Sequence, residues 1–108
     1  MATEEWVRAA GYDDVPEEDT LGTEIGGVPV CLYKLDGEIY ATDNKCTHGD
    51  ADLSDGLIQD GCEIECPLHE GRFDIRSGKA VSPPCSDDLR SYPARVEQGV
   101  IYIKLVHA

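Results

Sequence analysis

The sequence predicts a small all-β protein, because short runs of β-branched and aromatic residues alternate with turn residues. Val28–Leu35 is the clearest strand, and Asp36-Gly37 is a strong hairpin turn that leads into a returning strand at Glu38–Ala41. Evidence for helix is limited to single turns at Asp52–Gly56 and at Asp87–Leu89. Regularly spaced short strands favour an antiparallel β sandwich or barrel.

The remaining strands follow from the same pattern. Ser91–Val96 and Val100–Val106 flank a turn at Gln98-Gly99 and predict a second hairpin. Glu63–Cys66 and Arg72–Ile75 are shorter candidates. A chain of 108 residues without a linker or repeat predicts one domain, residues 1–108.

The charge balance excludes several classes of partner. Nine Lys and Arg face 22 Asp and Glu, which gives a net charge of −13. Such a surface repels phosphate, so we expect neither nucleic acid nor an anionic membrane as a partner. No apolar run approaches the roughly 18–20 residues of a membrane span, and the start, MATEEWVRAA, lacks the basic and apolar regions of a signal peptide. We therefore expect a cytoplasmic protein, in which the five Cys are thiols or metal ligands.

The central stretch differs in character from the rest of the chain. Residues 44–84 are dense in Cys, His, Gly and Pro and poor in continuous apolar runs. We interpret this stretch as an insertion, organised around a bound group, that the outer β segments carry.

Two short motifs in this insertion carry the chemistry. Cys46-Thr47-His48-Gly49 and Cys66-Pro67-Leu68-His69 each pair one thiol with one imidazole, and residues 49–65 separate them. Two Cys and two His could hold Zn²⁺, but a classical zinc finger pairs Cys with Cys and His with His. A [2Fe–2S] cluster with one iron on two Cys and the other on two His suits the mixed motifs, because each loop then gives one ligand to each iron.

These motifs resemble the two cluster-binding boxes of the Rieske family. The surrounding sequence is similar to the Rieske-type ferredoxins of bacterial aromatic-ring-hydroxylating dioxygenase systems, of the naphthalene and biphenyl type. The similar segments are GEIYATDNKCTHG (37–49), LSDG (53–56), EIECPLHEGRFDIRSGKA (63–80) and a carboxy-terminal YP…V…I pattern.

The resemblance implies a cofactor, a fold and partners. Cys46 and Cys66 would ligate one iron of the cluster, and His48 and His69 the other. The fold would be a Rieske-type antiparallel β structure with an inserted cluster-binding subdomain. The protein would not be an enzyme but a one-electron carrier from an NAD(P)H-dependent flavoprotein reductase to a terminal oxygenase. The small Rieske-like subunit of an assimilatory nitrite reductase is the alternative, and a zinc-binding module is a second one.

The sequence departs from the quinol-oxidising branch of the family in two respects. That branch joins its boxes by a disulfide, whereas Ala51 and Leu68 stand at the corresponding positions here. It also places a Ser and a Tyr hydroxyl near the cluster, where this chain has Gly71 and Phe73. Because these hydrogen bonds stabilise the reduced state, we expect a potential at the low end of the Rieske range, about −150 mV.

Three further cysteines lie outside the boxes. We expect Cys31 to pack in the core, Cys62 to be a free thiol within a strand and Cys85 to be a small loop residue. The resemblance also implies that a loop carrying Pro83 and Pro84 covers the cluster.

Overall fold

The computed structural model describes residues 6–47, 49–68, 71–82 and 87–105. Antiparallel strands dominate these residues, so the expected all-β class is confirmed. The strands are β1 (Trp6–Gly11), β2 (Asp19–Ile25), β3 (Val28–Leu35), β4 (Glu38–Asp43), β5 (Leu57–Gln59), β6 (Glu63–Glu65), β7 (Arg72–Asp74), β8 (Ala80–Ser82), β9 (Ser91–Tyr92), β10 (Ala94–Glu97) and β11 (Val100–Lys104). Two 3₁₀ turns, η1 (Tyr12–Asp14) and η2 (Leu53–Asp55), complete the described elements.

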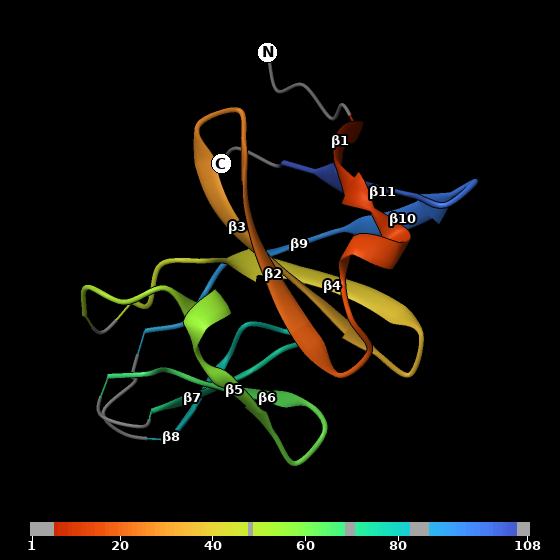
Figure 1. Cartoon of the computed structure of the whole chain (residues 1–108). Coiled ribbons are helices and arrows are strands. Elements are labelled where there is room, and N and C mark those ends of the chain that lie inside the picture. Colours follow the sequence, from red (N-terminus) through yellow and green to blue (C-terminus); the bar gives the residue numbers. More distant parts are fainter. Residues whose placement is uncertain (1–5, 48, 69–70, 83–86, 106–108) are drawn as a thin grey trace.

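The strands form three sheets that are stacked along the molecule (Figure 1). The order is β1-β11-β10 in the first sheet, β2-β3-β4-β9 in the second and β5-β6-β7-β8 in the third. The third sheet is built from residues 57–82, within the stretch expected to be an insertion. The loop after β4 and the loop between β6 and β7 extend towards the same side of the molecule, the left of Figure 1.

Strand β3 separates two hydrophobic cores. Cys31, Tyr33 and Leu35 pack into a core shared with the third sheet, whereas Val30 and Leu32 pack into a core shared with the first sheet. Because side chains alternate across a strand, burial on both faces explains why β3 reads as a nearly continuous apolar run.

The predicted hairpin turns are confirmed, and two others were missed, at Gly26-Gly27 between β2 and β3, with φ values of 57° and 82°, and at Asp60-Gly61. Asp36-Gly37 has φ values of 52° and 77°, and Gln98-Gly99 has 52° and 77°. Positive φ at both central residues is typical of type I′ turns, which match the twist of the flanking strands. Asp60-Gly61 adopts the same conformation, with 52° and 75°, between β5 and β6. The hairpin was missed because only one of its strands, β6, was predicted from the sequence as Glu63–Cys66, whereas β5 was not predicted.

Several expected elements differ from the structure. The run Ser91–Val96 is not one strand, because Pro93, which has no N–H to donate, divides it into β9 and β10 of different sheets. The expected turn of helix at Asp87–Leu89 is wrong, since these residues bind other segments instead of one another. The turn within Asp52–Gly56 is confirmed as η2. Strands β1, β2, β5 and β8 were not predicted.

A search for membrane-spanning segments was limited to helices in the described ranges. None there has the length and apolar character needed to cross a membrane.

Candidate metal centre

The two boxes form loops of the same design. Cys46 opens the first loop, and its N–H donates to the carbonyl of Ala51 over 2.9 Å. Cys66 opens the second loop, and its N–H donates to the carbonyl of Gly71 over 2.8 Å. Each hydrogen bond spans six residues, so each cysteine stands at the base of a closed loop.

An oppositely charged pair stands across the base of each loop. Lys45 forms an isolated β-bridge with Asp52, and their side-chain N and O atoms lie 3.6 Å apart. Glu65 pairs with Arg72 across β6 and β7, with Oε1 3.4 Å from Nε. The first pair comes from irregular backbone, whereas the second continues a hairpin ladder.

The loops bring the two predicted thiol ligands together. Cys46 and Cys66 are free thiols, and both are buried in the same core. Burial raises the pKa of Cys66 to about 11, and the neighbouring Cys46 thiol acts in the same direction. Because a metal binds the thiolate, occupation of this site must displace both protons.

The other two predicted ligands, His48 and His69, lie outside the described residues, as do Pro83, Pro84 and Cys85. Within the ranges that the structure does describe, no group of three or more His, Cys, Asp or Glu side chains is gathered for a metal ion. The donor chemistry still fits a Rieske cluster, because one sulfur from each loop can reach the same iron. The expected absence of a disulfide at Ala51 and Leu68 follows from their residue types.

The two loops also touch through apolar atoms. A Cβ built on Gly49 would lie 3.3 Å from Cδ1 of Leu68, so the second loop packs directly on the first. Leu68 remains 38% exposed and forms part of the surface at this end.

The floor beneath the cysteines is apolar and closely packed. Phe73 and Ile64 are fully buried in the same core as both cysteines. Phe73 can donate no hydrogen bond there, and Gly71 contributes backbone atoms alone, as the sequence indicated. Such a floor excludes water from one side of the site.

A buried polar chain in this core escaped the sequence analysis. The Tyr33 hydroxyl and Thr42 Oγ1 lie 2.8 Å apart, and Thr42 Oγ1 donates to the carbonyl of Asp43 over 2.9 Å. Thr42 has one hydroxyl proton, so Tyr33 is the donor of the first bond. Burial raises the pKa of the neighbouring Cys31 to about 12. Cys31 is thus a neutral core thiol, as expected.

The segment after the proline-bearing stretch is fastened to the first loop. Thr47 Oγ1 donates to the carbonyl of Asp87 over 2.7 Å. Asp43 accepts hydrogen bonds from the Tyr92 hydroxyl and the Arg90 N–H. Burial and the bond to Asp43 raise the pKa of Tyr92 to about 12. Sequence reasoning missed these residues because their partners lie about forty or more positions away.

Cys62 differs from its expected location. It lies in the turn between β5 and β6, not in a strand, and is a partly exposed free thiol. Its carbonyl accepts a hydrogen bond from Ile75 N–H over 2.9 Å. The turn end of this hairpin is opposite the end that carries Cys66, so Cys62 is not a member of the thiol pair.

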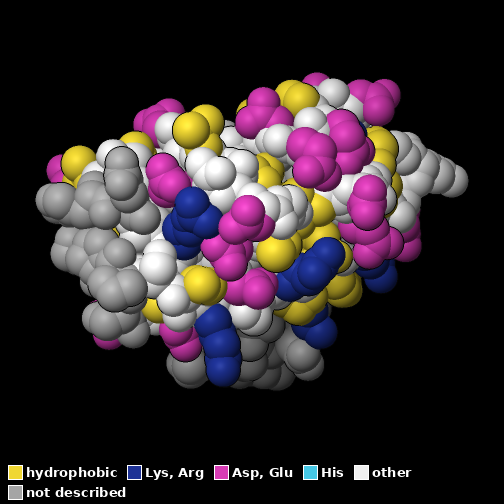
Figure 2. Space-filling view, turned by 90° about the horizontal axis from the view of Figure 1, so that it is seen from below, with side chains coloured by type: hydrophobic (Ala, Val, Ile, Leu, Met, Phe, Trp, Pro, Cys, Tyr) yellow, Lys and Arg dark blue, Asp and Glu magenta, His cyan; other side chains and the backbone are white. Residues whose placement is uncertain are grey.

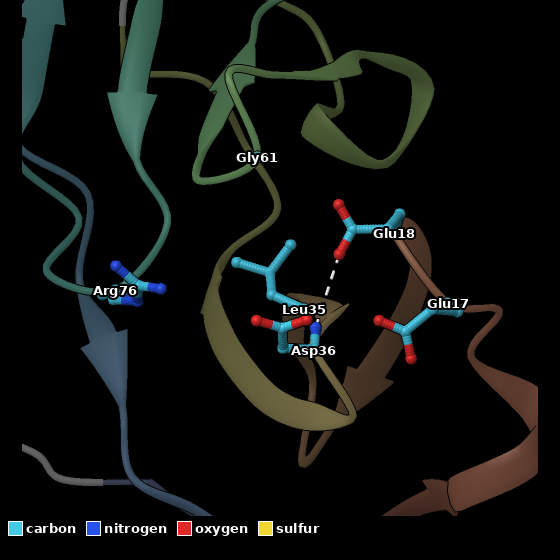
Figure 3. A pocket seen from close by; sticks show the side chains of 6 residues that line it. All are labelled: Glu17, Glu18, Leu35, Asp36, Gly61 and Arg76. Carbon is cyan, nitrogen blue, oxygen red and sulfur yellow. Dashed lines mark hydrogen bonds between the residues drawn. The ribbon is translucent and has the colours of Figure 1, made fainter.

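A cavity of about 480 Å³ lies at the turn end of the same hairpin. Figure 3 shows Glu17, Glu18 and Asp36 on one side of it and Arg76 on the other. Two of the carboxylates already accept backbone hydrogen bonds: Glu18 from Asp36 N–H and Glu17 from Gly37 N–H. This charged, open cavity lacks the apolar lining that is typical of a small-molecule site.

Comparison with known proteins identifies the family. The family model for the Rieske [2Fe-2S] domain matches residues 5–93. The chain belongs to the Rieske [2Fe-2S] domain family. Both the expected family and its Rieske-type [2Fe–2S] cofactor are thereby confirmed, and the zinc-binding alternative is set aside.

The relatives of this Rieske protein share nearly its full length. The ferredoxin component of naphthalene 1,2-dioxygenase/salicylate 5-hydroxylase systems from Ralstonia sp is 48% identical over 103 residues, covering 95% of this chain and 98% of the relative. The solved Sphingomonas yanoikuyae B1 ferredoxin is 37% identical with a TM-score of 0.87, covering 94% of this chain and 99% of the other. A ferredoxin solved in complex with the oxygenase of carbazole 1,9a-dioxygenase is 32% identical with a TM-score of 0.84, covering 94% of each chain. The expected Rieske-type fold is confirmed.

Proposed function

We propose that this chain is the ferredoxin component of an aromatic-ring-hydroxylating dioxygenase system. It takes electrons from an NAD(P)H-dependent flavoprotein reductase and passes them to a terminal Rieske oxygenase. The observation that carries this proposal is the similarity to dioxygenase ferredoxin components over 95% of the chain. The nitrite reductase alternative is not favoured, because the relatives are ferredoxin components.

The ligands of the cluster are Cys46 and Cys66 on one iron and His48 and His69 on the other in this proposal. The neighbouring thiols support the first half of the assignment, since two loops that are far apart in sequence bring both cysteines into one buried core. The second half rests on the motifs, which place each His two or three residues after its Cys. Residues 1–108 would form a single Rieske domain, with the cluster-binding insertion at about residues 44–84.

The chain's own residues hold and shield the cofactor. When bound, a Rieske cluster accepts and releases one electron. The closed loops fix both cysteine backbones, and the apolar floor at Ile64 and Phe73 keeps water from the inner side. The role of a carrier and not of a catalyst is supported by the relatives, which are ferredoxin components of dioxygenase systems.

The test is reconstitution with the reductase and the oxygenase from the same source organism. Oxygenase turnover driven by NAD(P)H should depend on this protein, and the protein should support many turnovers per molecule. Equal turnover without it, or permanent association with one large subunit, would contradict a carrier role. The electron transfer should also stop when both Cys46 and Cys66 are replaced by Ser.

Voltammetry of the loaded protein tests the environment of the cluster. We expect a reversible one-electron wave at about −150 mV, because Gly71 and Phe73 donate no side-chain hydrogen bond to the cluster. A wave far above zero would leave the carrier role intact but refute that explanation of the potential.

A further inference from the structure

The outer face of the third sheet lies directly beside the second box. Ile64 and Phe73 point into the core, so the alternate positions of β6 and β7 face outward. The strand register places Leu57, Glu65, Arg72 and Ser82 in one row across this face. Because Glu65 precedes Cys66 and Arg72 follows Gly71, the row borders the base of the second loop.

Exposed apolar side chains concentrate around this row. Five large hydrophobic residues are 36% exposed or more in the described chain, and three of them belong to residues 57–82. Leu57 is the most exposed at 64%, followed by Val81 at 49%, and Leu68 is 38% exposed. Leu57 and Val81 lie on the two edge strands, β5 and β8, and Leu68 lies in the loop between β6 and β7. In the strand register Leu57 is the partner of Glu65, and Val81 precedes Ser82, the partner of Arg72.

The centre of this surface carries fixed charge. Arg72 Nη1 lies 3.1 Å from Asp60 Oδ2 and 3.4 Å from Glu63 Oε1, and Nε lies 3.4 Å from Glu65 Oε1. Arg72, Asp60, Glu63 and Glu65 form the Arg72 quartet, in which one positive and three negative groups give a net charge of 1 − 3 = −2. Figure 2 views the molecule from below Figure 1, and on the side that it shows, hydrophobic and acidic side chains are interspersed with a few Lys and Arg.

We propose that this flank, defined as Leu57, Glu65, Leu68, Arg72 and Val81, is a docking surface for the terminal oxygenase. The inference rests on the proposed function and names the surface that performs it. The oxygenase would offer an apolar depression for Leu57, bordered by Lys or Arg that complement the quartet. An exposed apolar anchor beside a charged group is typical of interfaces, and complementary charge speeds the encounter.

Two observations support this occupant. The flank continues into the second loop, so a protein seated on it comes close to Cys66 without having to rearrange the fold. The flank includes two members of the Arg72 quartet, and that quartet carries a net charge of −2. The whole chain is also acidic, at −13, so a basic partner surface is attracted both from a distance and on contact.

The test compares Leu57→Ser with Val96→Ser in the cluster-loaded protein. Val96 is a matched control, because it is an exposed apolar strand residue at 40% but belongs to β10 of the first sheet. Visible spectrum and midpoint potential should be unchanged in both variants. Leu57→Ser should raise the apparent KM of the oxygenase for the ferredoxin about five- to tenfold, a typical effect of removing an interface anchor. Val96→Ser should change it less than about twofold, as expected for a residue outside the interface.

The sign of the partner's charge is tested separately at the same position. At low salt, Leu57→Glu should associate with the oxygenase faster than Leu57→Lys, and added salt should reduce the difference. The opposite order would refute a basic partner surface.

Other outcomes would also overturn the inference. Equal effects of Leu57→Ser and Val96→Ser would show that the flank is not a docking surface. If Leu57→Ser affects reduction by the reductase but not electron transfer to the oxygenase, the flank is a docking surface for the reductase and the proposal is wrong. If the protein self-associates as its concentration rises and Leu57→Ser abolishes this, the flank binds a second copy of the chain. Failure of the wild-type protein to reduce the oxygenase would instead refute the proposed function, which keeps the two failures distinct.

Discussion

The first and second box loops close in the same way but are held in place differently. The second loop joins β6 to β7, so its base is a hairpin ladder reinforced by the Arg72 quartet. The first loop follows β4 and rests on a single bridge between Lys45 and Asp52. Its position depends on side chains from elsewhere in the chain. One half of the site is therefore supported locally, and the other half by tertiary contacts.

Asn44 is the main support of the first loop. Its Oδ1 accepts from Ser54 N–H over 2.9 Å, and its carbonyl accepts from Leu53 N–H over 2.7 Å. Asn44 is 8% exposed, so its side chain cannot exchange these partners freely for water. Thr47 adds the bond to Asp87 described above. The second loop shows no comparable dependence on a distant side chain among the described residues.

The largest expected effect comes from removing a thiol of either loop. Cys46→Ser and Cys66→Ser should each abolish the Rieske visible and EPR signals, because both sulfurs serve the same iron in the proposed site. Cys62→Ser is the matched control, and it should retain the signals. If Cys46→Ser retained the cluster while Cys66→Ser lost it, Cys46 would not be an essential ligand of the cluster.

Replacing Asn44 should have the next largest effect, because Asn44 supports the first loop but not the second. Asn44→Ala leaves the partly buried N–H of Ser54 without its acceptor, which should lower the free energy of unfolding by about 1 kcal/mol. Thermal unfolding of the protein and the rate of cluster loss measure the effect. Asn44→Asp keeps an acceptor at the same place and should recover part of the stability. A variant as stable as wild type would show that the first loop is as self-supporting as the second.

The floor that both loops share should respond to alkaline pH. The folded pKa of Cys31 is raised from 9.0 to about 12, so this thiol stabilises the fold below pH 9 and its contribution is lost as pH rises towards 12. Between these values unfolding should become easier by up to about 1.4 kcal/mol per pH unit from this group.

Cys31→Val tests this expectation, because it removes the ionisable group but keeps the apolar volume. Urea unfolding at pH 8 and at pH 10 should show a smaller pH dependence in the variant than in wild type. Identical slopes would show that Cys31 does not account for the alkaline loss.

The smallest effects should come from the charged pairs at the loop bases. Arg72→Gln should lower the thermal midpoint slightly, and Lys45→Gln by less, because exposed ion pairs contribute little and Lys45 is 60% exposed. Thermal unfolding of both variants at low and high salt measures the difference, which salt should reduce. If Lys45→Gln lost more stability than Arg72→Gln, the ion pair at the base of the first loop would contribute more than the pair at the base of the second.

The sequence by itself determined the chemistry of the site and much of the β scaffold. The mixed boxes predicted a [2Fe–2S] cluster because residue type and spacing within a loop are local properties. Strand β3 and the turns at Asp36-Gly37 and Gln98-Gly99 were predicted for the same reason, since alternation, β-branching and positive φ are encoded in a few neighbouring residues.

Tertiary structure alone decided what surrounds the cysteines. The edge strands β5 and β8 were not predicted from the sequence, and in the structure they pair with β6 and β7, which provide their partners. The support of the first loop by Asn44 and Thr47, the Tyr33–Thr42 pair and the clustering of Leu57, Leu68 and Val81 all join segments that are distant in sequence. Such contacts exist only after the chain has folded, because burial and long-range hydrogen bonds are properties of the packed molecule and not of any local segment.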